Sequence, residues 1–259
     1  MLAAIVLLLL STGPAFISGL QCNFCRRGVE VNYTVTSTNV PPLPSDCTAI
    51  EAPACWMSVF WDLTRKQTFL EYHDRPEADR NAANDSVAVR IFKGMEPDNT
   101  TLYAGQEVTY ECQDGDKCNS PESIAKVLAA LTVEDTLQQE IGPLLKIITP
   151  FDPREANCVF FHNASVRCPP PDLRGGRRCV VEAGMQATRG EEACATCGDE
   201  EGRDNFAERF KIFNLADPSR DFDVAGLGCQ LKGCNSVANA NLIFKASTIK
   251  FNSEKFKRS

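Results

Sequence analysis

The chain has 259 residues, which is enough for one large domain or two small ones. With 43% hydrophobic and 24% charged residues, its composition is that of a globular protein and excludes wholesale disorder. A net charge of −7 argues against a nucleic-acid partner, because phosphate binding needs a concentrated basic surface.

Residues 1–19 predict a signal peptide. They carry no charged side chain, and the apolar run Leu2–Leu10 is broken by Ser11-Thr-Gly-Pro14. An uncleaved membrane anchor is the alternative, but Pro14 and the lack of flanking basic residues argue against it. Because no hydrophobic tail follows Asn235, we also expect no lipid anchor, and we predict a secreted, extracellular protein.

Thirteen cysteines fit this compartment, since secreted proteins use cysteines mainly for structural disulfides. Four Asn-x-Ser/Thr sequons fit it as well, and each predicts a glycosylated surface loop. Their acceptor residues are Asn32, Asn84, Asn99 and Asn163.

Short segments rich in β-branched and aromatic residues predict a mainly β, disulfide-rich protein. These segments are Cys55–Asp62, Gln67–Tyr72 and Ser86–Phe92 in the first half, and Cys158–Phe161, Cys179–Glu182 and Phe206–Leu215 in the second.

Residues 120–153 contain no cysteine and predict a short helical connector. Ser120 and Pro121 are typical of a helix start, and Gly142-Pro143 is expected to bend or break a second helical segment. The apolar residues at helical spacing are Ile124, Val127, Leu128 and Leu131, then Leu137, Ile141, Leu144 and Leu145. We expect an element that packs on a sheet or joins two modules; a membrane-binding helix is the alternative.

Residues 236–259 form a basic segment in an acidic chain. Five basic residues outweigh Glu254 and give this segment a charge of +4. We expect a flexible or strand-like tail, with weak attachment to anionic surfaces or matrix as the alternative.

The cysteine motifs resemble those of the lymphocyte-antigen/urokinase-receptor superfamily. Leu20-Gln-Cys22-Asn-Phe-Cys25 resembles its opening motif, and both Cys112…Cys118-Asn119 and Cys229…Cys234-Asn235 resemble its closing motif. The resemblance implies two tandem three-finger, snake-toxin-like modules at 20–119 and 154–235, each with three loops on a disulfide-linked base. It also implies that Asn119 and Asn235 are structural.

The resemblance further implies a set of disulfide bonds. In the first module these are Cys22–Cys55, Cys25–Cys47 and Cys112–Cys118, although six cysteines alone allow 15 pairings. The second module departs from the pattern, because Phe161 stands where the first module has Cys25. Cys158–Cys179 and Cys229–Cys234 are expected there, and the pairing of Cys168, Cys194 and Cys197 stays open, with an odd thiol among them.

Cys194-Ala-Thr-Cys197 is the one candidate for redox or zinc chemistry. Its acidic surroundings raise a thiol pKa and disfavour a reactive thiolate, so we favour a structural disulfide within the pair or to Cys168. His73 and His162 are the only histidines, and no catalytic, metal or cofactor site is predicted.

The resemblance implies a secreted, non-enzymatic binding protein that modulates a receptor, channel or extracellular enzyme through its finger loops. Its partner would be an extracellular or cell-surface protein. Candidate contact residues are Tyr72, His73, Arg75, Arg80 and Tyr103. The alternatives are a disulfide-rich redox protein or enzyme that uses Cys194 and Cys197, and a component of the extracellular matrix.

Overall fold

The structure is a computed structural model that describes residues 19–74, 85–95, 102–146, 157–163, 178–186, 190–198 and 205–258. All but the last residue of the predicted signal peptide lie outside these ranges, as do Asn84 and Asn99 of two predicted glycosylation sites.

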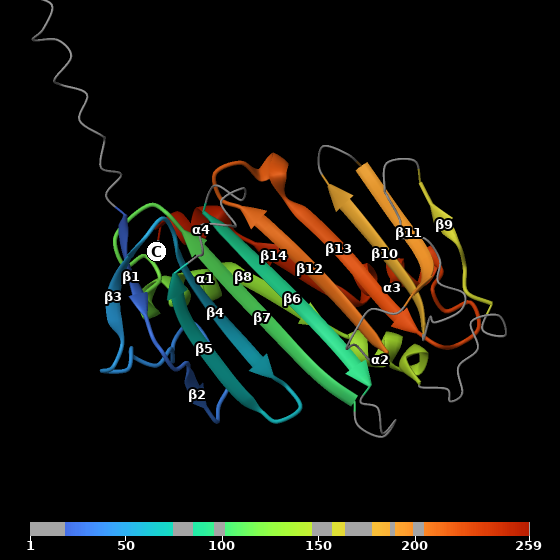
Figure 1. Cartoon of the computed structure of the whole chain (residues 1–259), viewed down its shortest axis with the longest axis horizontal. Helices are drawn as coiled ribbons and strands as arrows, with labels where there is room; N and C mark the ends of the chain where they lie inside the picture. Colours follow the sequence, from blue (N-terminus) through green and yellow to red (C-terminus); the bar gives the residue numbers. More distant parts are fainter. Residues whose placement is uncertain are drawn as a thin grey trace, which may run out of the picture.

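A ten-stranded antiparallel sheet dominates the molecule, so the prediction of a mainly β, disulfide-rich protein is confirmed (Figure 1). Its spatial order is β2-β5-β4-β7-β6-β12-β13-β10-β11-β9. The first half supplies β2 (Val29–Val31), β4 (Cys55–Asp62), β5 (Gln67–Asp74), β6 (Ser86–Met95) and β7 (Leu102–Cys112). The second half supplies β9 (Phe161–His162), β10 (Arg178–Gln186), β11 (Gly190–Gly198), β12 (Phe206–Asn214) and β13 (Phe222–Cys229), with a 3-10 turn η4 (Pro218–Arg220) before β13.

One face of this sheet is covered by helices and a small second sheet, which Figure 1 shows behind it. The helical elements are α1 (Pro121–Ala130), α2 (Leu137–Ile141), η3 (Gly142–Leu145), α3 (Val237–Ala246) and α4 (Ser253–Arg258). Strands β8 (Leu131–Asp135) and β14 (Ser247–Phe251) pair between them. A further pair, β1 (Leu20–Phe24) with β3 (Thr48–Ala52), lies at the β5 end.

The two halves are related by an approximate two-fold axis. In each half a Cys-Asn-Ser sequence is followed by a ten-residue helix and a five-residue strand, and these two strands pair antiparallel. The backbone bonds at their ends come in equivalent pairs: Thr136 N–H donates to Ala246 O at 2.8 Å, and Asn252 N–H donates to Ala130 O at 2.9 Å. The short helices are exchanged across this axis, since α2 packs on α3 and α4 packs on α1.

The same symmetry runs through the large sheet, where β6 of the first half pairs with β12 of the second. Met95 N–H donates to Asn205 O, and Leu215 N–H donates to Asp85 O, both at 2.9 Å. The two halves therefore share one continuous sheet. The repeated sequence motifs predicted two similar halves, but they did not predict that strands β6 and β12 pair.

The connector differs in part from its prediction. Ser120 caps α1 by accepting a hydrogen bond from Ser123 N–H, and α2 ends at Ile141 before Gly142-Pro143, both as predicted. Leu131, expected on the helix face, instead begins strand β8, because the backbone leaves the helical conformation there with φ −89° and ψ 140°.

The prediction of a flexible or strand-like tail is wrong for most of residues 236–258. Ser236 caps α3 by accepting from Asn239 N–H, and α3 places Ala240, Ile243 and Ala246 in the core. Strand β14 then pairs with β8, so this basic segment is an integral part of the helical layer.

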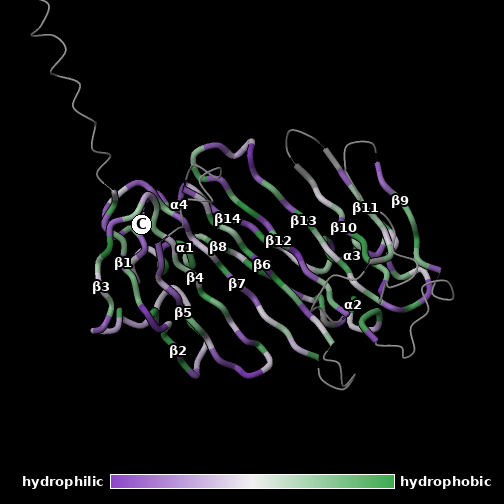
Figure 2. Tube along the Cα trace, viewed as in Figure 1, coloured by the Kyte–Doolittle hydropathy of each residue, from purple (hydrophilic) through white to green (hydrophobic). Residues whose placement is uncertain are grey.

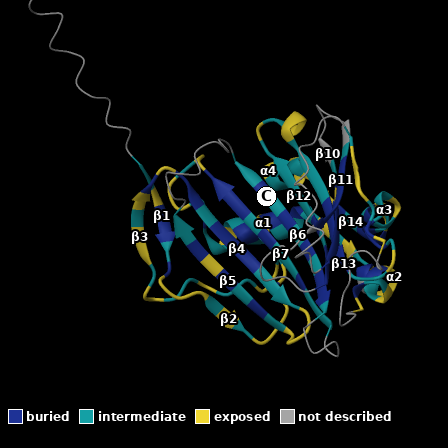
Figure 3. Ribbon diagram, turned by 45° about the vertical axis from the view of Figure 1, so that its right-hand side comes forward, coloured by how far each residue is buried: buried dark blue, intermediate teal, exposed yellow. Residues whose placement is uncertain are grey.

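Alternation of buried and exposed side chains explains the strands and the core. Val87, Val89 and Ile91 of β6 are fully buried and face the helical layer, whereas the residues between them are half-buried on the other face. Figure 2 shows hydrophobic and hydrophilic stretches alternating along the central strands, and Figure 3 shows buried residues concentrated there.

Five disulfide bonds join the same cysteines that the resemblance implied. They are Cys22–Cys55, Cys25–Cys47, Cys112–Cys118, Cys158–Cys179 and Cys229–Cys234. These bonds cross-link both halves of the molecule and limit the conformational freedom of the unfolded chain.

Candidate binding surface

The sequence-predicted contact residues do not form one site. Tyr72 is only 1% exposed, and burial raises the pKa of its phenol to about 12, so its prediction as a contact residue is wrong. The prediction assigned Tyr72 to the wrong face of its strand, since Tyr72 points into the core. His73, the next residue, is half-buried on the opposite face, where its ring lies 5.6 Å from that of Trp56. Arg75 and Arg80 lie outside the described residues.

Tyr103 belongs to a line of four rings that crosses the sheet face without helices. This aromatic row consists of Phe69 on β5, Phe60 on β4, Phe92 on β6 and Tyr103 on β7. Ring centroids are 6.0 Å apart for Phe60 and Phe69, 5.8 Å for Phe60 and Phe92, and 6.2 Å for Phe92 and Tyr103. All four side chains are half-buried, so each keeps part of its ring in contact with solvent.

Two glycines make room for the aromatic row. A Cβ on Gly105 would lie 2.4 Å from Phe92 Cζ and 2.8 Å from Phe60 Cε2, closer than real Cβ contacts. A Cβ on Gly94 would lie 2.0 Å from Tyr103 Cζ. The rings of Phe60 and Phe92, which are parallel to within 2°, therefore lie close to the backbone at Gly105, where a larger residue would leave no room for them.

An arginine lies beside Phe92 of the aromatic row. Arg90 forms a salt bridge with Glu208 of β12, with Nε to Oε2 at 3.0 Å, and its guanidinium lies 5.4 Å from the Phe92 ring centroid. This ion pair spans the joint between the two halves of the sheet. Glu107 lies opposite Arg90 on β7, and burial raises the pKa of its carboxyl, with Arg90 opposing and Glu71 adding to the rise.

The uncovered face is acidic. Because side chains alternate along each strand, the pairing register of the eight strands from β2 to β10 assigns six carboxylates that are not buried to this face and only one such arginine, Arg90. The carboxylates belong to Glu30, Asp62, Glu71, Glu107, Glu182 and Glu208. The described part of this face is thus an acidic surface crossed by a row of aromatic rings.

The Cys-x-x-Cys sequence lies on a strand, not at a helix start. Cys194 and Cys197 are three residues apart on β11, so their side chains point to opposite faces of the sheet. Cys194 is disulfide-bonded and Cys197 is a buried thiol, so a disulfide within the pair is wrong. This geometry does not present two neighbouring thiols to a substrate or a metal.

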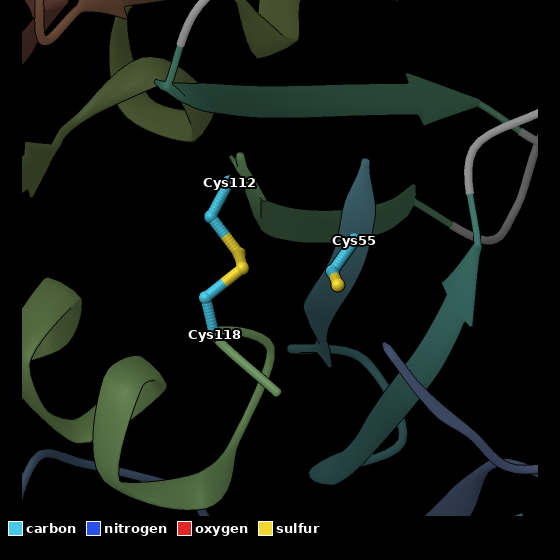
Figure 4. A group of neighbouring side chains, drawn as sticks. All are labelled: Cys55, Cys112 and Cys118. Carbon is cyan, nitrogen blue, oxygen red and sulfur yellow. A yellow bond between two sulfur atoms is a disulfide. The ribbon is translucent and has the colours of Figure 1, made fainter. Parts of the chain in front are cut away.

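Three sulfur atoms lie within 4.8 Å of one another at Cys55, Cys112 and Cys118, which Figure 4 shows side by side. Cys55 is bonded to Cys22, and Cys112 to Cys118. Metal sites use thiolate sulfur, so this group is best described as two packed disulfides at the base of the first half.

Both closing asparagines are fully buried and tie the strands together, in the structural role that the resemblance implied. Asn119 Oδ1 accepts from Asn23 N–H at 2.9 Å, and its Nδ2 donates to three backbone carbonyls. Asn235 Oδ1 accepts from Val159 N–H at 2.8 Å, and its Nδ2 donates to three carbonyls in the same arrangement.

Within the part of the chain that the structure describes, no helix is both long and apolar enough to cross a membrane. Comparisons of the chain with protein-family models, with curated proteins and with solved structures found no match.

Proposed function

We propose that this chain is a secreted, non-enzymatic binding protein whose uncovered sheet face contacts an extracellular or cell-surface protein. Modulation of a receptor, channel or extracellular enzyme is the role that we assign to it. The observation that carries the proposal is the aromatic row, Phe69, Phe60, Phe92 and Tyr103, which is partly exposed and preordered.

Preorganisation favours binding, because ordering flexible side chains on association costs free energy. The aromatic row rests on antiparallel strands that are stapled by disulfides at one end, and Gly105 holds two of its rings close to the backbone. Aromatic side chains are also enriched among the residues that contribute most to protein interfaces.

The charge of this face indicates the chemistry of the partner. Five of the six carboxylates are strand neighbours of the aromatic row, Glu182 lies farther away on β10, and the one arginine is already paired with Glu208, so a basic surface is complementary to this face. The partner that we propose is a basic protein surface with an apolar anchor that packs on the rings.

The test is a binding measurement with matched variants. Wild-type protein would be used to capture partners from extracellular fluid, and each purified partner would then be titrated with Phe60→Ser and Phe92→Ser. Phe160→Ser is the control, because this ring is 50% exposed but lies at the other end of the molecule, before β9.

We expect the aromatic-row variants to lose affinity by about tenfold or more, since a central interface aromatic contributes on the order of 2 kcal/mol. The control should bind as wild type does. Binding should also weaken as salt rises, because charged surfaces are screened. Equal affinity of all variants for every partner would remove the uncovered face as the binding surface.

A further inference from the structure

A cavity of ≈ 570 Å³ lies under the second half of the sheet, between β10, β11, the edge strand β9 and helix α3. Its apolar wall includes Phe161, Ala183, Ala193 and Phe244, and its polar boundary includes Asn163 and Asn241. A space of this size lies within the range of about 300–1,000 Å³ that holds small organic groups.

The two-fold relation accounts for part of this space. In the first half, Val59 and Leu70 are cross-strand partners on the covered face and are 0% and 1% exposed. The equivalent cross-strand partners in the second half are Ala183 and Ala193. Five side-chain carbons are therefore missing from this layer, and the second half keeps open the space that the first half fills.

The occupant is indicated by what lies at the edge of the cavity. Phe161 lines it yet is 45% exposed, which is high for a large aromatic side chain. Asn163 follows two residues later, and its N–H donates to Ala193 O at 3.3 Å, so it is held beside the same space. Asn163 is also the acceptor of the Asn163-Ala-Ser165 sequon.

We propose that this cavity holds the first sugars of an N-linked glycan carried by Asn163. The transfer forms a bond between Asn163 Nδ2 and C1 of N-acetylglucosamine. It breaks the bond between C1 and the diphosphate oxygen of a lipid-linked oligosaccharide, and the lipid diphosphate and the amide proton leave. The apolar C–H face of the sugar then packs on the Phe161 ring, and its hydroxyl and acetamide groups bond to polar side chains such as Asn241 at the mouth.

The glycan would replace the core side chains that the second half lacks. It covers the exposed part of Phe161 and part of the alanine wall, so attachment stabilises the folded state over the unfolded one. This inference uses the helix-covered side of the molecule and is independent of the binding surface proposed above.

The test uses the full chain expressed in a mammalian secretory line. Glycopeptide mass spectrometry would measure the occupancy of Asn163, and native digestion with an amidase that cleaves N-glycans would measure glycan release. The internal reference is Asn32, a sequon asparagine that is exposed in the first half. Phe161→Ser and Ala193→Leu are the test variants, and Phe160→Ser is the matched control, since Phe160 does not line the cavity.

We expect the Asn163 glycan to be released about tenfold more slowly than the Asn32 glycan, because release requires local opening. Phe161→Ser should abolish this protection, and Phe160→Ser should leave it unchanged. Ala193→Leu should also abolish it without lowering the melting temperature, since leucine refills the space. Asn163→Gln should lower the melting temperature and Asn32→Gln should not.

Two results would overturn the proposal. One is secreted, folded protein in which Asn163 carries no glycan or carries one that is released as fast as that of Asn32. The other is a small molecule that is retained in the cavity by native mass spectrometry and is lost in Ala193→Leu.

Discussion

Replacing Asn119 by alanine tests how much the fold depends on one buried amide. The side chain contacts four backbone groups: Oδ1 accepts from Asn23 N–H, and the two hydrogens of Nδ2 are shared among the carbonyls of Asn23, Trp56 and His73 at 2.8, 3.1 and 3.3 Å. At about 1 kcal/mol for each of the three hydrogens involved, the substitution costs about 3 kcal/mol of unfolding free energy. This is a large fraction of the roughly 5–15 kcal/mol that stabilises a domain.

Asn235→Ala should cost the same, because Asn235 makes the equivalent contacts with one N–H and three carbonyls in the second half. Asn119→Asp should cost at least as much as alanine, since it keeps the acceptor but turns a buried negative charge toward three carbonyl oxygens.

The assay is urea unfolding with intact disulfides, followed by the fluorescence of Trp56 and Trp61, the chain's two tryptophans. Gln139→Ala on the exposed side of α2 is the control and should change the free energy by less than about 0.5 kcal/mol. If Asn119→Ala costs less than about 1 kcal/mol, other groups satisfy these carbonyls and the role assigned to the amide is refuted. If the variant is not secreted in folded form, the free energy of unfolding would be measured for Asn119→Ser instead, since a serine hydroxyl keeps one donor and one acceptor.

Three further predictions concern the sheet. Gly105→Ala should displace the Phe92 ring and cost about 1–3 kcal/mol in urea unfolding, and Phe92→Ala should remove most of that cost. Lys93→Met should cost about 3–5 kcal/mol, because it leaves Asp135 buried without its 3.0 Å ion-pair partner, and adding Asp135→Leu should recover most of the loss. Glu107→Gln should raise the melting temperature at neutral pH. The folded-state pKa of Glu107 is raised, chiefly by burial, so ionisation above that pKa costs stability; the advantage of the variant should therefore vanish below pH 4.5, the ordinary pKa of the group. An advantage that persists at low pH would contradict this cause.

Local patterns were enough to predict five strands of the large sheet wholly or in part, namely β4, β5, β6, β10 and β12, whereas Cys158–Phe161 was predicted as a strand and only Phe161 belongs to one. Cys55–Asp62 was predicted with the bounds of β4, and Ser86–Phe92 falls within β6, because alternating burial on a pleated strand leaves a period of two in the sequence. The start of α1 was predictable for the same reason, since the Ser120-Pro121 cap is a local interaction.

Strand β8 and the folded C-terminal segment were not predictable in this way. Leu131 continues the helical spacing of α1, and only pairing with Phe251, 120 residues later, makes it the start of a strand. Long-range pairing of this kind overrides local propensity and leaves no local signal. The resemblance supplied the five disulfide pairs, which spacing alone could not.

The aromatic row was not predicted as a unit, although Tyr103 was named as a candidate contact residue, because its residues are far apart in the sequence. Phe60, Phe69, Phe92 and Tyr103 come from four strands, and each sits at a position of ordinary alternation. The sequence signal that could have found the row is the pair Gly94 and Gly105. Glycine inside a strand pattern often marks close approach of another group, and here each lies beneath an aromatic ring.

The symmetry also shows where the two halves were free to diverge. Lys93 corresponds to Phe213, by the same shift of 120 residues that relates Met95 to Leu215, and Asp135 corresponds to Phe251, by the shift that relates Cys118 to Cys234. The first half thus joins β6 to β8 by a buried ion pair at 3.0 Å, and the second joins β12 to β14 by two rings 5.6 Å apart. The two contacts occupy equivalent positions between the large sheet and the β8–β14 pair. This position therefore requires two side chains that fit each other, and both an ion pair and an aromatic pair meet that requirement. The paired asparagines show the opposite behaviour, because their amide accepts from one N–H and at the same time shares two donor hydrogens among neighbouring carbonyls. The two halves therefore differ in their core contacts, on the uncovered face and at the cavity. Changes at these places can give each half its own function, while the asparagine contacts keep the fold that both halves share.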